Sequence, residues 1–308
     1  MKRKILVALS SFGEFDDRPL RLLDESGFEY KLNPYGRRLK AEEIIEMGKD
    51  CEGIIAGLEV YEDHVLEHLP SLRCISRCGV GTDNISLGKA EQLGIVVTNT
   101  PDAPVTAVAE MTIALTLNLL RKISFHNELM KKRIWDREIG YLLNGKKVGV
   151  LGLGRIGRRV AELFIPFGAV VYGADLFPEE AWAKRHGVRI LTTNELIEMC
   201  DILTIHISIL KGKEFLLNKD AILSMKKGAF LVNLSRGKII DEDALYDALK
   251  SKHLAGAALD VFTKEPYDGP LCELENVILT PHIAAFTQES RTQMEVETVE
   301  NLLDSLKS

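Results

Sequence analysis

The sequence predicts an α/β protein with two doubly wound parallel sheets. A chain of 308 residues is too long for one ordinary hydrophobic core and suits two domains. Short segments rich in Val, Ile and Leu alternate with amphipathic segments of helical spacing, as in sheets covered by helices on both faces. The apolar segments form two series, separated by a long and nearly uncharged helical pattern.

The first series predicts a small doubly wound unit. Its expected strands are Ile5–Leu9, Gly53–Ala56, Cys74–Arg77 and Ile95–Asn99. Helical patterns lie between them at Ala41–Gly48 and Leu87–Leu93, and Gly94 suits the end of the latter.

A long helix is expected between the two series, because Pro104 suits a helix start and Val105–Leu120 carries little charge. The chain then becomes polar around Trp135, which is either an interface anchor or a packed surface residue. The terminal stretch Gln288–Leu306 is amphipathic and is expected to return to the first domain. We therefore expect one domain of residues 1–99 plus 284–308 and another of residues 100–283.

The second series predicts a larger parallel sheet that begins near Lys146. The expected strands are Val148–Leu151, Val170–Ala174, Ile202–Ile207, Phe230–Leu234, Ala257–Val261 and Val277–Leu279.

Composition narrows the partners and the compartment. A net charge of −6 without a basic block argues against nucleic acid or an anionic membrane as a partner. The apolar run Ile5–Leu9 is too short for a signal-peptide core, and no stretch approaches the roughly 20 apolar residues of a membrane span. The five cysteines lack CxxC spacing, so we expect no metal site and a cytoplasmic location.

A dinucleotide-binding motif opens the second series. The predicted strand Val148–Leu151 runs into Gly152-Leu153-Gly154-Arg155-Ile156-Gly157, and a helical pattern follows. Gly152 permits a tight turn, Gly154 lets the backbone approach a pyrophosphate, and Gly157 allows close packing of helix on strand. The free N–H groups of the helix start favour phosphate there. A bare glycine-rich turn is the simpler alternative, but the strand–turn–helix order favours the dinucleotide.

Asp175 ends the next predicted strand and indicates which dinucleotide is bound. Its carboxylate accepts hydrogen bonds from ribose hydroxyls and repels a 2′-phosphate. Leu176 and Phe177 follow it and offer no positive charge to such a phosphate. The sequence therefore predicts NAD as the cofactor, in preference to NADP. It also disfavours a flavodoxin-like FMN protein, because this unit specifies a dinucleotide.

Polar side chains follow three later strands of the second series. Arg236, Asp260 and His282 each stand just beyond a predicted strand. Ligands of doubly wound sheets bind beyond the carboxyl ends of the strands, so we expect these three side chains to meet above a bound nicotinamide ring.

The motifs resemble those of the D-isomer-specific 2-hydroxyacid dehydrogenase family. The resemblance lies in "GLGRIG", "NLSRGKIIDEDAL", "AGAALDVFTKEP" and "TPHIAAFT", and extends to "SRCGVGTDNI" and "VTNTPDAPVTAVAEMTIAL". It implies a Rossmann NAD-binding domain inserted in a flavodoxin-like substrate domain, hydride transfer between NAD and a small 2-hydroxy or 2-oxo acid, and a homodimer.

The resemblance implies a catalytic set of Arg236, Glu265 and His282. A guanidinium fork at Arg236 can hold the carboxylate and carbonyl oxygen of the substrate, although a surface salt bridge is the alternative. His282 resembles the family's acid/base, and Glu265 would orient it and favour the imidazolium. Taken alone, His282 would more often be a structural histidine.

Other positions match cofactor and substrate contacts of the family. Asp260 matches a residue that contacts the nicotinamide carboxamide, although a turn-capping aspartate is the alternative. The loop Cys78-Gly79-Val80-Gly81 is a candidate substrate site, because its glycines let backbone N–H groups converge on an anion. Arg77 can add charge there or serve in packing, and nothing near Cys78 suggests an activated nucleophile. The remaining expected cofactor contacts are Arg155, Ile156, Thr106, His206, Ser208 and Ser235.

Two departures affect the finer expectations. Relatives commonly carry Pro where this chain has Ser208, and threonines beyond it, in the segment His206–Lys211 that should border the adenine. The stretch Ala56–Val60 lacks an arginine near where phosphate-handling relatives can place one. The chain also ends without the regulatory domain of some relatives, so feedback control by that route is not expected.

The sequence leaves alternatives open for both the substrate and the class of function. The motifs look most like the phosphoglycerate dehydrogenase branch, with glyoxylate or hydroxypyruvate reduction next. Formate oxidation is disfavoured, because it needs no proton relay of the Glu265–His282 kind. A different class also stays open, since some relatives are NAD-sensing corepressors that act as interaction modules. The lack of an extended polar tail weighs mildly against that role.

Overall fold

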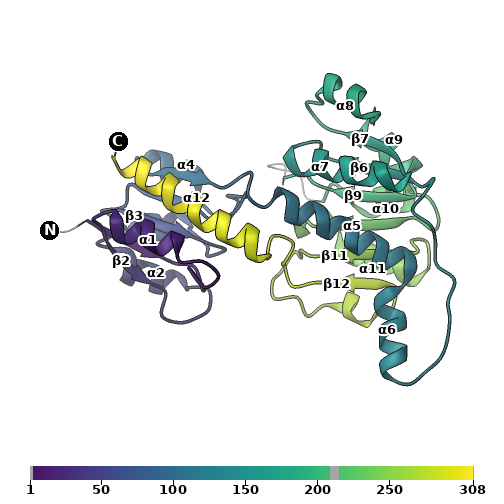
Figure 1. Cartoon of the computed structure of the whole chain (residues 1–308), viewed down its shortest axis with the longest axis horizontal. Coiled ribbons are helices and arrows are strands. Elements are labelled where there is room, and N and C mark those ends of the chain that lie inside the picture. Colours follow the sequence, from purple (N-terminus) through teal and green to yellow (C-terminus); the bar gives the residue numbers. More distant parts are fainter. Residues whose placement is uncertain (1–2, 209–214, 308) are drawn as a thin grey trace. The chain divides into compact units, whose positions relative to one another are not determined.

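The structure, a computed structural model, describes residues 3–208 and 215–307 and divides into two compact units. The terminal unit comprises Met1–Pro104 and Phe286–Ser308, and the central unit comprises Val105–Ala285. The predicted fold class is confirmed, because the strand pairs of both sheets are parallel throughout the described residues. Figure 1 shows the course of the chain through both units.

The terminal unit has the strand order β2-β1-β3-β4-β5, which is that of flavodoxin-like sheets. Its strands are β1 (Lys4–Val7), β2 (Glu29–Leu32), β3 (Gly53–Ala56), β4 (Cys74–Arg77) and β5 (Val96–Asn99). The sequence analysis missed β2, because this edge strand is mostly polar and only partly buried and so lacks the apolar pattern of the others.

Helices cover both faces of this sheet, because consecutive strand residues point to opposite sides. Leu6, Ile54 and Ile75 pack against α2 (Ala41–Gly48), α3 (Asp63–Glu67) and α4 (Leu87–Gln92). The opposite face carries α1 (Arg18–Glu25) and the long α12 (Gln288–Lys307), whose Leu302 and Leu306 lie over Gly53. Figure 1 shows α12 lying along this unit.

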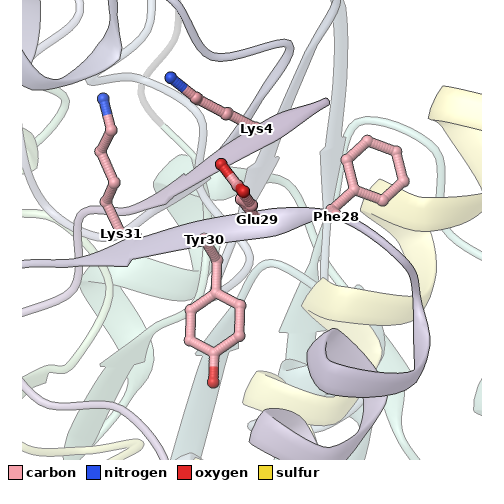
Figure 2. Close-up of a pocket in the computed structure, with 5 residues that line it drawn as sticks. All are labelled: Lys4, Phe28, Glu29, Tyr30 and Lys31. Carbon is pink, nitrogen blue, oxygen red and sulfur yellow. The ribbon is translucent and has the colours of Figure 1, made fainter. Parts of the chain in front are cut away.

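A surface depression of the terminal unit is drawn in Figure 2 and is lined by Lys4, Phe28, Glu29, Tyr30 and Lys31. Lys4 and Glu29 are the first residues of their strands, so the depression lies at the amino end of the sheet. Both lysines form ion pairs of 2.6 Å with Asp50. Doubly wound sheets bind ligands at the opposite, carboxyl end, so this depression is not the candidate site.

The central unit has the strand order β12-β11-β10-β9-β6-β7-β8. The strands are β6 (Lys147–Leu151), β7 (Val170–Ala174), β8 (Arg189–Ile190), β9 (Ile202–Ile205), β10 (Phe230–Asn233), β11 (Gly256–Leu259) and β12 (Val277–Leu279). The sequence analysis missed β8, because two residues at a sheet edge are too few for an alternating pattern. The predicted strand Ile202–Ile207 ends early, since His206 already belongs to the loop beyond the sheet.

The two faces of the central sheet bury separate apolar clusters. One cluster packs under α5 (Val105–Arg121), α7 (Arg155–Phe164) and α8 (Glu180–His186). The other packs under α9 (Thr193–Met199), α10 (Lys219–Ser224) and α11 (Glu242–Lys250). Short 3₁₀ turns occur at η1 (Ile165–Phe167), η2 (Gly237–Ile239) and η3 (Pro270–Glu273). The sheet is thus covered on both sides, and only its strand ends are open to a ligand.

One helix of the central unit stands apart from both clusters. α6 (Ile123–Lys131) buries none of its residues, and Figure 1 shows it projecting from the end of α5. Large apolar side chains are exposed on α6 and on the chain that follows it, with Trp135 81% and Ile139 93% exposed. Trp135 is therefore not the packed surface tryptophan that the sequence allowed as one reading.

Candidate functional site

The strand order of the central sheet reverses between β6 and β9. The chain leaves β6 for β7 and β8 on one side, and it returns to β9 on the other side. Such a switch point opens a crevice at the carboxyl ends of the strands, where doubly wound sheets bind their ligands. The glycine-rich turn follows β6 and His206 follows β9, so both lie at this crevice.

The glycine-rich turn has the geometry that a dinucleotide requires. Gly152 has a φ of 96°, and a Cβ there would lie 2.5 Å from the carbonyl oxygen of His206. A Cβ on Gly157 would lie 1.8 Å from the carbonyl oxygen of Gly152, so the helix start packs directly on the turn. A Cβ on Gly154 would meet nothing within 4 Å, which leaves room for a ligand to approach the backbone. The close contacts at Gly152 and Gly157 leave no room for a side chain at either position.

The first turn of α7 offers amide groups at this place. Its first intrahelical bond runs from the Arg158 amide to the Gly154 carbonyl at 3.0 Å. The amides of Arg155, Ile156 and Gly157 therefore precede the intrahelical pattern, as at every helix start. Together with the helix dipole they favour a phosphate group.

Asp175 follows β7 beside the glycine-rich turn. One carboxylate oxygen accepts the Leu153 amide at 2.6 Å, and the other accepts the Phe177 amide at 2.9 Å. These bonds fix the half-buried carboxylate next to the turn, while Leu176 and Phe177 are exposed. The site therefore presents a fixed negative charge, with no cation in the two residues that follow.

His206 packs against the other side of the turn. Its Nε2 is buried without a hydrogen-bond partner in the described part of the chain. Burial lowers the pKa of the imidazole to about 3, so His206 is neutral at physiological pH. Ser208 is exposed, whereas Ile209, Leu210 and Lys211 of the expected adenine segment lie outside the described residues.

Arg236 follows β10 on a turn organised by a buried asparagine. The side-chain oxygen of Asn233 accepts the amide and hydroxyl of Ser235, at 3.0 and 2.8 Å. The Asn233 amide group donates to the Arg236 carbonyl at 2.9 Å, and the Arg236 guanidinium donates to the Ser235 carbonyl at 2.8 Å. Asn233 thus sets the direction in which Arg236 leaves the sheet.

Glu265 and His282 form a hydrogen-bonded pair. His282 Nδ1 lies 3.0 Å from each carboxylate oxygen of Glu265. Both side chains are partly exposed, at 30% for His282 and 21% for Glu265. Glu265 therefore occupies Nδ1 and leaves Nε2 as the nitrogen that can meet a substrate.

Asp260 follows β11 and holds the loop that carries His282. Its buried carboxylate accepts the Thr280 hydroxyl at 2.6 Å, the Ile283 amide at 2.8 Å and the Ala284 amide at 2.8 Å. Burial raises the pKa of Asp260, and these bonds oppose the rise. His282 itself has a φ of 56°, a left-handed conformation that costs a non-glycine residue energy. Asp260 therefore acts at least as the turn-capping aspartate considered above.

The expected polar groups therefore follow three neighbouring strands. β10 pairs with β11, and β11 pairs with β12, all in parallel. Arg236, Asp260 and His282 consequently leave the same edge of the sheet, which is also the edge of the glycine-rich turn. Thr106, in contrast, is exposed in the first turn of α5.

The loop Cys78–Gly81 follows β4 in the terminal unit. The Cys78 amide donates to Ala56 at 2.8 Å, and the Gly79 amide donates to the buried Thr100 hydroxyl at 2.7 Å. Of the four amides expected to meet an anion, those of Val80 and Gly81 have no partner in the part of the chain that the structure describes. Burial raises the pKa of the Cys78 thiol, which keeps it protonated and unreactive.

Sequence reasoning missed three side chains that build this geometry: Asn233, Thr280 and Thr100. Each is a polar residue at or beside the end of a predicted strand, which was the available signal. Their partners are backbone groups or residues distant in sequence, so only the fold identifies their role.

Neither a metal centre nor a membrane span emerges from the described ranges. Within 3–208 and 215–307, no three His, Cys, Asp or Glu side chains gather as metal ligands. Over the same ranges, no helix is long and apolar enough to cross a membrane.

The fold and the strand-edge geometry define an α/β protein with a Rossmann-type dinucleotide-binding unit. Comparison with known families agrees: a family model described as "D-isomer specific 2-hydroxyacid dehydrogenase, NAD binding domain" matches residues 113–284. The chain belongs to this family, and NAD is the cofactor of its central unit. The resemblance noted from the motifs is thereby confirmed.

Individual relatives differ in name and in length. D-3-phosphoglycerate dehydrogenase of Rattus norvegicus is 38% identical over 310 residues, which cover 99% of this chain and 57% of the relative. Glyoxylate reductase of Korarchaeum cryptofilum is 34% identical over 312 residues, covering 98% of this chain and 92% of that protein. The chain thus spans little more than half the length of the first relative.

A solved structure extends the similarity to three dimensions. D-lactate dehydrogenase of Aquifex aeolicus, complexed with NAD and lactic acid, has a TM-score of 0.87 and 28% identity. The match covers 99% of this chain and 96% of that chain.

The role of Asp260 in holding the loop can be measured as stability. We expect Asp260→Asn to lower the free energy of unfolding by about 1–3 kcal/mol, because an NH₂ group would then face buried amide donors. Urea denaturation of the purified protein measures the change. Asp268→Asn is the control, since Asp268 is exposed on the segment between β11 and β12 and should leave stability unchanged. Equal stability of the two variants would contradict the role given to Asp260.

Proposed function

We propose that this protein is an NAD-dependent dehydrogenase of small D-2-hydroxy acids. It would pass a hydride between NAD and the 2-carbon of a hydroxy or oxo acid. The observation that carries the proposal is the Glu265–His282 pair, in which both carboxylate oxygens lie 3.0 Å from Nδ1. Its place at the strand edge of an NAD-binding unit supplies an acid/base beside the cofactor site.

His282 would move the substrate proton. When bound, NAD accepts the hydride from C2 during oxidation and, as NADH, returns it during reduction. Nε2 of His282 takes the hydroxyl proton during oxidation, and the imidazolium gives it back during reduction. Glu265 accepts the Nδ1 hydrogen and so fixes the tautomer with a free Nε2. It also stabilises the imidazolium by its negative charge.

Arg236 would position the substrate. A guanidinium fork can bind both the carboxylate and the C2 oxygen, which aligns the carbon with the cofactor. The Asn233 turn holds the Arg236 backbone and thereby limits the directions that the side chain can take. The loop Cys78–Gly81 of the terminal unit is a further candidate for binding a carboxylate, through the amides of Val80 and Gly81.

The cofactor contacts proposed here follow the geometry of the crevice. The glycine-rich turn and the start of α7 would bind the pyrophosphate, and Asp175 would bind the ribose hydroxyls. The other proposed contacts are Thr106, Arg155, Ile156, His206, Ser208, Ser235 and Asp260. The open space at Gly154 supports this assignment, because it lets the phosphates approach the backbone, while Gly152 and Gly157 allow the turn and the helix start to pack closely.

The names of the relatives suggest two candidate substrates. 3-Phosphoglycerate is the first candidate, because its dehydrogenases are 37–41% identical to this chain. Glyoxylate or hydroxypyruvate is the second, because a glyoxylate reductase aligns over nearly its whole length. A panel of 3-phosphoglycerate, glyoxylate, hydroxypyruvate and D-lactate, followed by NADH absorbance, separates them. Tight NAD binding without turnover of any panel member would instead favour an NAD-sensing, corepressor-like module.

We also propose that two copies of this chain associate and that the protein works in the cytoplasm. Several large apolar side chains of α6 and of residues 132–142 are exposed, which supports association, since monomers rarely expose large apolar patches. The five cysteines are all free, which fits a reducing compartment.

The acid/base role is tested by His282→Gln. We expect turnover to fall by about 10²–10⁴-fold, because the hydroxyl proton loses its acceptor. NAD affinity, measured by calorimetry, should stay nearly constant. His186→Gln, on α8 of the same unit, is the matched control and should keep full turnover. Unchanged turnover in His282→Gln would remove this residue from the mechanism.

The cofactor preference is tested by Asp175→Ala. We expect the ratio of kcat/KM for NAD to that for NADP to fall by about 10–100-fold, because hydrogen bonds to a charged group are lost together with the repulsion of the 2′-phosphate. Glu180→Gln, an exposed acid at the start of α8, should leave the ratio unchanged. Equal use of NAD and NADP by the parent protein would contradict the role of Asp175.

Self-association is tested on the α6 surface. We expect the parent protein to sediment at twice the chain mass and Ile139→Asp to shift it toward the monomer, because the charge would be buried on association. Phe177→Asp alters an equally exposed residue elsewhere in the central unit and should not change the mass. A monomeric parent protein would refute the homodimer.

A further inference from the structure

The carboxyl edge of the terminal sheet carries a second feature beside the candidate substrate loop. β3 pairs with β4 so that Ala56 lies opposite Arg77, and the chain continues into Gly57–Glu59 on one strand and Cys78–Gly81 on the other. The Cys78 amide donates to Ala56, and the Asn84 side chain donates to the carbonyls of both Gly57 and Glu59. The turn after β3 is therefore fastened next to the substrate loop.

Glu59 places a buried carboxylate in this turn. The residue is 3% exposed, and its carboxylate accepts the Gly57 amide at 2.7 Å. A Cβ on Gly57 would lie 2.7 Å from Leu9 and 3.1 Å from a carboxylate oxygen of Glu59. The space is thus filled by the carboxylate, and a cationic side chain at position 57 has no room.

The positive charges of two arginines at the same edge act on the Glu59 carboxylate. Arg38 comes from the segment after β2, and the buried Arg77 ends β4. Burial raises the pKa of Glu59, while its hydrogen bonds and the positive charges of Arg38 and Arg77 oppose the rise. Arg77 also donates to the Cys78 carbonyl, so its guanidinium lies at the substrate loop.

The charge of a third arginine near the substrate loop is also compensated by a buried carboxylate. Arg291, in the first turns of α12, donates to a carboxylate oxygen of the buried Glu295 at 2.6 Å and to the Ser11 carbonyl at 2.6 Å. The other oxygen of Glu295 accepts the Gly13 amide at 2.9 Å. Its charge reaches Cys78, because Arg291 and Arg77 both favour the thiolate of that residue. Arg291 is therefore paired with a carboxylate supplied by the fold, and the charges of Arg38 and Arg77 act on that of Glu59.

The compensation of these arginine charges by buried carboxylates affects which substrate tails can bind here. A phosphate brings a charge of about −1.5 to −2 at neutral pH, in addition to the carboxylate that every 2-hydroxy acid carries. To bind beside the loop, it would have to compete with Glu59 for the arginines and approach a buried negative charge. A hydrogen, methyl or hydroxymethyl tail meets no such opposition.

We propose that Glu59 is a specificity-determining residue that makes this site select small 2-oxo and 2-hydroxy acids without a phosphate on the tail. The inference rests on the proposed dehydrogenase function and chooses between its two substrate candidates. It favours hydroxypyruvate or glyoxylate over the phosphorylated acid.

The test compares two substrates that differ only by the phosphate. Hydroxypyruvate and 3-phosphohydroxypyruvate are reduced with NADH, and kcat and KM are measured separately. We expect the parent protein to prefer hydroxypyruvate by roughly tenfold or more in kcat/KM, mainly through KM, because like charges in contact are strongly disfavoured. Preference for the phosphorylated substrate would overturn the inference while upholding the dehydrogenase. Absence of turnover with either, and with glyoxylate and D-lactate, would overturn the dehydrogenase itself and the inference with it.

Two variants locate the effect in Glu59. Glu59→Gln should lower the KM for 3-phosphohydroxypyruvate several-fold and leave both values of kcat near the parent. Arg38→Gln changes an exposed residue, so folding is preserved, and it should raise that KM because Glu59 loses a counter-charge. Glu43→Gln, an acid paired with Arg37 on α2, is the control and should alter neither substrate. The role of Glu59 would be refuted if the ratio of kcat/KM for the two substrates stayed at the parent value in Arg38→Gln and, where that variant folds, in Glu59→Gln.

Discussion

The carboxylate of Asp260 holds the loop on which the proposed chemistry of this fold depends. It stands at the end of β11 and accepts three hydrogen bonds from residues 280–284, which follow the neighbouring β12. These bonds hold His282 in a left-handed backbone conformation that the residue would not adopt by itself. In that conformation Nδ1 meets Glu265, from the segment that also follows β11. A buried charge is expensive unless it is fully hydrogen-bonded, and here that cost is offset by fixing the loop of the proposed acid/base.

The same edge solves a second problem, which is how to bind phosphates without a cluster of basic side chains. Gly152 and Gly157 bring the turn, the helix start and the strand end into direct contact, so that backbone amides serve as the donors. Asp175 then adds a negative charge at a fixed place, held by the Leu153 and Phe177 amides. Attraction and repulsion are thus supplied by different groups, and the proposed preference for NAD over NADP depends on the second of them.

Much of this was predictable from sequence because it depends on local order. A strand, a glycine-rich turn, a helix, a strand and Asp175 follow one another within a short stretch, and most strands of the parallel sheets are compact apolar runs. The edge strands β2 and β8 were missed, since partly exposed or very short strands carry no such run. The hydrogen bonds of Asp260, Asn233 and Thr100 could not be predicted, because their partners are set by strand neighbours rather than by spacing. For the same reason, the sequence could not tell that the Cys78 and Gly79 amides are already engaged.

The terminal unit extends this logic from the cofactor to the substrate. Arginines at a strand edge would ordinarily indicate a polyanion site, and Arg38, Arg77 and Arg291 all belong to the terminal unit that carries this edge. Burial reverses the argument, because Glu59 and Glu295 are themselves buried, and Glu295 accepts a hydrogen bond from Arg291. A buried carboxylate cannot move into solvent to make room for a phosphate, whereas an exposed one could. In the proposed role of Glu59, the selectivity of this edge is governed by the acids that the fold encloses, and the arginines alone give a misleading picture of the ligand.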